Sequence, residues 1–188
     1  GGGKSMMALQ IAMQIAGGPD LLGIGDMPAG GVVYLPAEDP PPILHHRLHA
    51  IGAHISGDKR LVIADSLLVQ PVIGQQPDIM QQRWKDSLTR GAEGKRLMIL
   101  DTLRRFHVED ENDSGAMARV IAQLEAIADD TGCAIIFLHH TSKGAALTGA
   151  GDQQQASRGS SVLVDNVRWQ GYLSGMSAGE AEKLGVAQ

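Results

Sequence analysis

The sequence predicts an α/β domain in which a mostly parallel sheet is flanked by helices. Short apolar runs alternate with segments of helical periodicity along the chain, which is the pattern of strands joined by crossover helices. The composition is globular, with 43% hydrophobic and 20% charged residues. The 188 residues suffice for one domain with a sizeable core, and we find no internal repeat or clear domain boundary. We therefore expect residues 1–188 to form a single domain.

The first half of the chain contains both kinds of periodicity. A helix is predicted over Met6–Ala16, whose apolar residues recur along one face, and Gly17-Gly18-Pro19 ends it. The further elements expected here are a buried strand at Gly31–Pro36, a short helix at Ile43–Ile51, strand-like residues within Leu61–Val69, and a helix at Ile79–Thr89.

The second half continues the alternation. Lys95-Arg96 leads into a strand at Leu97–Leu100, which ends at Asp101. Ser114 is the expected N-cap of an amphipathic helix that runs to about Asp129. The remaining predictions are a strand at Ala134–Leu138, a flexible functional loop over residues 144–160, a strand at Val162–Trp169, and a short helix at Ala178–Leu184 capped by Ser177.

Composition restricts the possible functions. The net charge of −5 and the aromatic content of 3% indicate neither a bulk basic surface nor an aromatic platform for nucleic acid, so such a site would need a local cluster of Lys and Arg, built in an oligomer if not in the monomer. The single cysteine, Cys133, excludes an intrachain disulfide and is expected to be buried. No apolar run approaches the ~20 residues of a membrane span, and we expect a cytoplasmic protein without membrane partners.

The chain opens with half of a phosphate-binding motif. Gly1-Gly2-Gly3-Lys4-Ser5 matches the end of G-x-x-x-x-G-K-[ST], in which glycine N–H groups surround the phosphates. The lysine reaches the β- and γ-phosphates, the serine hydroxyl binds Mg²⁺, and the next helix adds its positive dipole end. A Gly-rich flexible terminus would look alike, although the apolar helix that follows favours the phosphate loop. Since the motif's first half is absent, we expect the sequence to be a fragment of a longer protein.

Carboxylates follow two predicted strands. Asp101 ends an apolar strand, where ligands bind in open parallel sheets, and could hold Mg²⁺. Glu38 follows the strand Val32–Pro36 and could orient and deprotonate a water that attacks a γ-phosphate. Asp39 is a weaker candidate for the same role. The alternatives are a turn-capping Asp and a solvated charge in a Pro-rich turn.

Two histidines follow the third predicted strand of this group. His139 and His140 should point to opposite faces, because side chains alternate along a strand. One imidazole could contact a γ-phosphate while the other packs locally. A metal site is the alternative, but no third His or Cys stands nearby at ligand spacing. His45, His46 and His49 are expected on the surface of the short helix.

Five stretches together resemble a known family: GGGKS, VVYLPAEDP, RLMILDTLRRF, GCAIIFLHHTSKG and GAGDQQQASRGSSVLVDNVRW. They closely resemble the hexameric replicative DNA helicases of broad-host-range plasmids, which belong to the RecA/DnaB-like P-loop ATPases. The resemblance covers nearly the whole chain and implies a RecA-like P-loop NTPase core that binds ATP and Mg²⁺ between subunits. Compared with that family, the chain lacks the first strand and the C-terminal strands.

The resemblance also implies residue roles. Glu38 would be the catalytic carboxylate, His140 the γ-phosphate sensor, and Arg168 an arginine finger that reaches a neighbouring subunit. The nucleotide would be held by Gly1, Gly2, Gly3, Lys4, Ser5 and Asp101, with Ser5 and Asp101 on the metal. From the residues alone, the favoured interpretation of Arg168 is a surface strand arginine that covers Trp169.

Cations in the loops suggest a DNA-binding surface. Arg104 and Arg105 follow the strand that ends at Asp101, and Lys143 and Arg158 flank the Gly/Gln-rich loop. In RecA-type rings such loops line the central channel, so the resemblance implies single-stranded DNA as a partner of a homo-oligomeric, hexameric ring. The alternative is that these are ordinary loop charges.

The predicted function is therefore an ATP-driven DNA helicase or translocase subunit. A RecA-like ATP-binding switch without unwinding activity is the alternative and should assemble without DNA stimulation. A P-loop small-molecule kinase should carry an acceptor pocket and an Arg-rich lid, which the sequence does not suggest.

Overall fold

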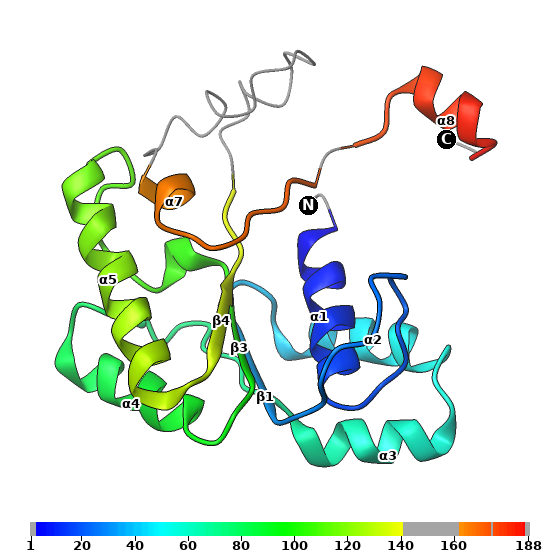
Figure 1. Cartoon of the computed structure of the whole chain (residues 1–188), viewed down its shortest axis with the longest axis horizontal. Helices are drawn as coiled ribbons and strands as arrows, with labels where there is room; N and C mark the ends of the chain where they lie inside the picture. Colours follow the sequence, from blue (N-terminus) through cyan, green and yellow to red (C-terminus); the bar gives the residue numbers. More distant parts are fainter. Residues whose placement is uncertain (1–2, 141–161, 174, 187–188) are drawn as a thin grey trace.

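The computed structural model describes residues 3–140, 162–173 and 175–186, and its centre is a parallel sheet. Four strands lie in the order β2-β1-β3-β4 (Figure 1). Their bounds are Val32–Pro36 for β1, Leu67–Val69 for β2, Leu97–Asp101 for β3 and Ala134–Phe137 for β4. All three strand pairs are parallel. The predicted α/β class is confirmed.

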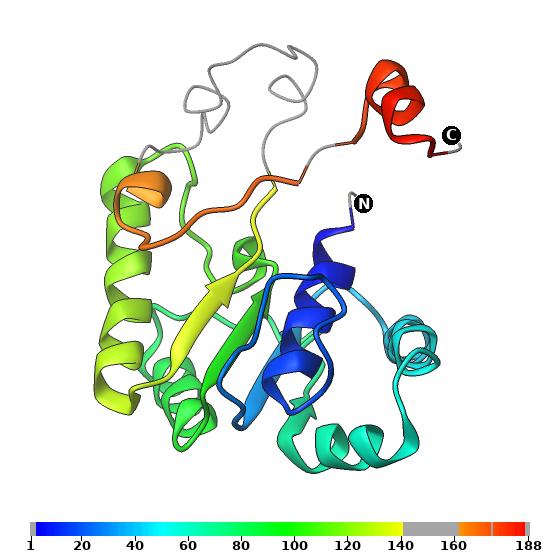
Figure 2. The same ribbon diagram turned by 45° about the vertical axis from the view of Figure 1, so that its right-hand side comes forward.

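Helices cover both faces of this sheet (Figures 1 and 2). One face carries α1 (Lys4–Ile15), α2 (Pro41–Gly52) and α3 (Gly57–Ser66). The opposite face carries α4 (Gln82–Ala92) and α5 (Ser114–Thr131). A short 3₁₀ helix, η1 (Leu103–Arg105), follows β3, and the C-terminal part contains α7 (Val162–Asp165) and α8 (Ala178–Leu184).

Alternation along the strands divides the apolar residues between two cores. In β1, Val32 and Tyr34 face the helix layer of α1 to α3, whereas Val33 and Leu35 face α4 and α5. In β3, Leu97 and Ile99 share the first core, and Met98 and Leu100 share the second. Each strand position therefore fixes which helix layer its side chain meets. This rule also determines where the polar residues beyond the strand ends point.

The helix α5 is the clearest case of sequence dictating structure. Its buried stripe includes Met117, Val120 and Leu124, at the spacing of one helical face. The N-cap lies one residue earlier than predicted: the helix begins at Ser114, and Asp113 is the N-cap, whose carboxylate accepts hydrogen bonds from the N–H groups of Gly115 and Ala116. A carboxylate satisfies free N–H groups and also interacts favourably with the positive helix end, which accounts for the choice.

Two segments in which strand residues were predicted are helical over part of their length. Most of Leu61–Val69 belongs to α3, and only Leu67–Val69 pairs with β1. Leu61 and Val62 are 69% and 47% exposed, so the apolar residues that suggested a strand lie on the outside of a helix. The predicted strand Val162–Trp169 is also wrong: Val162–Asp165 forms α7, whose Leu163 is buried in the core beside α5. In α7, the packing of Leu163 into the core overrides the preference of β-branched residues for strands.

The helix predicted over Ile79–Thr89 begins only at Gln82. The preceding Ile79 is fully buried, and its N–H donates to the carbonyl of Phe106 at 2.8 Å, which holds it outside the helix. Other expectations are confirmed: Cys133 is buried, and Ser177 caps α8 through a capping box with Glu180. The predicted loop at 144–160 lies outside the described residues. Within the described part of the chain, no helix combines the length and apolar content that crossing a bilayer requires.

Candidate functional site

The candidate functional residues gather at the carboxyl-terminal edge of the sheet. Pro36 of β1 stands beside Asp101 of β3, so Glu38 and Asp101 emerge from neighbouring strands at the same edge. The residues after β4 leave from this edge as well, because the strands are parallel. A pocket of about 130 Å³ lies here, lined by Gly3, Lys4, Ser5, Met6, Arg47, Asp101, Thr102, Leu138 and His140.

The described part of the phosphate loop opens α1. Lys4 and Ser5 are its first two residues, and both line the pocket. Gly3 is the N-cap with a φ of +77°, a left-handed conformation that residues with a β-carbon rarely adopt. The positive end of this 12-residue helix therefore points into the pocket, which suits an anion. Gly1 and Gly2 lie outside the described residues.

Asp101 points towards α1 and the phosphate loop. It continues the Leu97–Ile99 alternation, which faces the first core, and it is only 3% exposed. The hydroxyl of Tyr34, from the neighbouring strand, donates a hydrogen bond to its Oδ2. Burial and the Asp101 charge raise the pKa of Tyr34 far above its usual range, so the phenol stays a donor. Sequence reasoning missed Tyr34, although the period-two alternation placed it on the right face.

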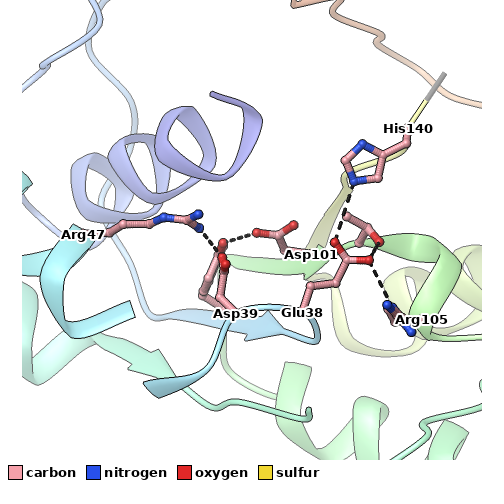
Figure 3. Close-up of polar contacts among 8 residues, drawn as sticks. Glu38, Asp39, Arg47, Asp101, Arg105 and His140 are labelled. Atoms are coloured by element: carbon pink, nitrogen blue, oxygen red, sulfur yellow. Dashed lines mark hydrogen bonds and ion pairs between the residues drawn. The ribbon is translucent and has the colours of Figure 1, made fainter. Parts of the chain in front are cut away.

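Glu38 lies beside polar side chains from the segments that follow β3 and β4 (Figure 3). Its Oε1 accepts from Arg105 Nε at 3.0 Å and from Thr102 Oγ1 at 3.4 Å. Its Oε2 lies 3.8 Å from Nε2 of His140. The side chain is 38% exposed, so water can reach the carboxylate. Arg105, predicted as a DNA contact, thus lies against the candidate catalytic base.

Asp39 turns away from Glu38 and pairs with Arg47 of α2 (Figure 3). This ion pair engages the carboxylate of the weaker candidate base. Arg47 itself lines the phosphate pocket and adds a second cation to that of Lys4. Sequence reasoning missed Arg47, because nothing in the run His45-His46-Arg47 distinguishes it from its exposed neighbours; His45, His46 and His49 are exposed as predicted.

The two histidines after β4 diverge, as predicted. His140 follows the register of Ile136 and Leu138, on the α1 side, and lines the pocket. His139 follows Ile135 and Phe137, on the α5 side, and its Nε2 lies 3.4 Å from Oε1 of Glu111.

That Glu111 oxygen also lies 3.7 Å from Nε2 of the buried His107. Burial lowers the pKa of both imidazoles, while the charge of Glu111 acts in the opposite direction. Within the described residues, no three His, Cys, Asp or Glu side chains are arranged to hold a metal ion by themselves.

Two of the remaining predicted cations, Arg104 and Arg168, do not line the pocket. Arg168 is exposed, in the irregular segment after α7 rather than in a strand. Arg104 is exposed, and its guanidinium donates to the carbonyl of His107 at 3.3 Å. Lys143 and Arg158 lie outside the described residues.

The pocket's chemistry fits a magnesium–nucleotide complex. The Ser5 hydroxyl and the Asp101 carboxylate line the same space and are the oxygen ligands that Mg²⁺ prefers. Protein sites usually supply only one or two such groups to Mg²⁺ and leave the rest to phosphate and water. Lys4, Arg47 and the start of α1 supply the positive charge that phosphates need. A family model described as "AAA domain" (AAA_25) matches residues 1–146 of the 188.

Proposed function

This chain belongs to the AAA domain family whose model it matches, a family of P-loop ATPases of the RecA/DnaB-like kind, and from that membership we propose that it is a subunit of a ring-forming DNA helicase. In this proposal it resembles RepA, the hexameric replicative helicase of broad-host-range plasmids. ATP hydrolysis would drive the ring along single-stranded DNA during plasmid replication.

The observation that carries the proposal is the meeting of four groups at one sheet edge. Lys4 and Ser5 begin α1, Asp101 ends β3, Glu38 follows β1 and His140 follows β4. The strands β1, β3 and β4 lie far apart in the sequence, and their parallel arrangement in the sheet brings their carboxyl-terminal ends together. The set supplies a phosphate cation, oxygen ligands, a carboxylate base and a sensor.

Each residue would then have a distinct role. Lys4 would bind the β- and γ-phosphates, and Ser5 and Asp101 would hold Mg²⁺, which when bound neutralises charge on the phosphates. Glu38 would orient and deprotonate the attacking water. His140 lies between the pocket and Glu38, where it could respond to the presence of the γ-phosphate.

Assembly would complete the site. Arg168 is exposed and so is free to reach a neighbouring subunit, where a guanidinium could neutralise charge on the transferred phosphoryl group. A net charge of −5 argues against strong DNA binding by one subunit, whereas a ring repeats its loop cations around a single channel. Arg104 is one such cation, and Lys143 and Arg158 are the others.

The test is the ATPase rate per subunit as a function of protein concentration, with and without single-stranded DNA. A ring motor predicts a rate that rises with concentration and rises further with DNA. Arg168→Ala should remove the concentration-dependent rise but keep ATP binding. Arg90→Ala, an exposed arginine at the end of α4, is the matched control and should behave like the wild type.

The other outcomes separate the alternatives. A rate that ignores both concentration and DNA would refute the ring helicase. Nucleotide-dependent assembly without DNA stimulation would favour an ATP-binding switch. Stimulation by a small phosphoryl acceptor would instead indicate a kinase.

A further inference from the structure

Arg105 and His140, which both contact Glu38, lie close in sequence to two histidines that contact a second carboxylate, Glu111. Arg105 stands two residues before His107, and His140 stands directly after His139. His107 and His139 both approach Oε1 of Glu111, at 3.7 and 3.4 Å between Nε2 and oxygen. Together with the chain connections between Arg105 and His107 and between His139 and His140, these contacts link Glu38 to Glu111 along two paths.

A backbone hydrogen bond joins these two paths, and a side-chain hydrogen bond lies within the path that contains Arg105. The N–H of Leu103, at the start of η1, donates to the carbonyl of Leu138 at 2.8 Å. The guanidinium of Arg104 donates to the carbonyl of His107 at 3.3 Å. The segment that carries Arg105 is therefore hydrogen-bonded to the strand end that carries His140, and Glu111 contacts a histidine from each.

The Glu111 cluster has unusual hydrogen bonding. Glu111 Oε1, His139 Nε2 and both ring nitrogens of His107 are buried, and the separations of 3.4 and 3.7 Å to Glu111 are longer than an ordinary hydrogen bond. The His107 side chain is completely buried. Buried polar atoms that are this loosely paired cost stability, which favours a role for the cluster other than packing.

We propose that Glu111 is a positioning residue of the ATPase centre, which holds His107 and His139 so that Arg105 and His140 stay against Glu38. Among the residues that the structure describes, Glu111 forms no hydrogen bond or ion pair with Glu38 or with the pocket lining, and it acts through the two histidines. The inference rests on the proposed role of Glu38 as catalytic base, and it does not require DNA or a ring.

The direct test compares Glu111→Gln with Glu109→Gln in the full chain. Glu109 lies in the same loop, and its side chain pairs with Arg119 at 3.4 Å instead of with His107 or His139. It therefore receives the same substitution as a control. We expect Glu111→Gln to lower kcat about tenfold, because small misplacements of catalytic groups are costly. The KM for ATP and the thermal midpoint should match those of Glu109→Gln. A fall in ATP affinity or stability with unchanged kcat would assign Glu111 a structural role and overturn the proposal.

A double-mutant cycle sharpens the test. If Glu111 acts through His139, then Glu111→Gln and His139→Gln remove the same link, and the double variant should lose about tenfold in kcat, as each single variant does. Independent losses that multiply to about a hundredfold would refute the shared pathway. Failure of the helicase proposal would appear differently, as a basal rate that single-stranded DNA does not stimulate, and would leave this cycle intact.

Discussion

Replacing Tyr34 by phenylalanine removes one hydroxyl from beneath α1 and leaves the rest of the sheet unchanged. Tyr34 is 0% exposed and Asp101 is 3% exposed, so water has little access to replace the lost donor. Hydrogen bonds to charged groups contribute roughly 1.5–3 kcal/mol, and an unsatisfied buried acceptor costs a similar amount. We therefore expect the free energy of unfolding to fall by about 2 kcal/mol, which for a chain of this length lowers the midpoint by roughly 4–8 °C.

Urea unfolding followed by circular dichroism measures this change. Tyr172→Phe is the control, because Tyr172 is 42% exposed and its variant should stay within about 0.5 kcal/mol of the wild type. The Tyr34 variant should also need more Mg²⁺ for half-maximal ATPase, since Asp101 loses the donor that fixes its orientation. A loss of stability below about 0.5 kcal/mol, with an unchanged slope in urea, would show that the hydroxyl does not support Asp101.

Three further predictions concern the same edge of the sheet. Glu38→Gln should lower kcat by about 10²–10⁴, with ATP binding retained, as measured by steady-state ATPase and nucleotide titration. Arg47→Ala should weaken ATP more than it weakens ADP, because the lost cation faces the phosphate pocket; equal losses in a fluorescent-nucleotide titration would contradict this. Stability should fall as the pH drops below 6.5, because burial lowers the folded-state pKa of His107 and His139 and the unfolded chain then binds more protons. The slope is at most about 1.4 kcal/mol per pH unit for each histidine, and replacing both by Gln should flatten it in urea unfolding at several pH values.

Strands with continuous apolar runs could be predicted well from sequence, including β4, which is only partly buried. The runs at 32–36, 97–101 and 134–137 are apolar at nearly every position, which is typical of parallel strands covered by helices. The same alternation predicted that His139 and His140 would diverge. By contrast, Leu61 and Val62 suggested strand residues but lie exposed on the helix α3. Their exposure depends on how neighbouring elements pack, which the local sequence does not reveal.

The candidate site was predictable only where a motif or a strand end marked it. Lys4, Ser5, Glu38, Asp101 and His140 follow such signals, and the structure places them together. The supporting residues carry no local signal. Tyr34, Arg47 and Glu111 gain their roles from partners far away in the sequence or across an element, so only the tertiary structure identifies them.

The alternation that separates the two cores has a consequence for which mutations the gene can accept. Deleting one codon within β3 would leave an apolar strand able to pair, yet it would turn the Asp101 carboxylate from the α1 side to the side of α4 and α5. Such a protein could still fold while losing the carboxylate that we propose holds Mg²⁺. Length changes in the connections, for example between α1 and β1, do not change which face of the sheet a strand side chain points to. Natural relatives should therefore vary in loop length while keeping the count of residues in β3 fixed.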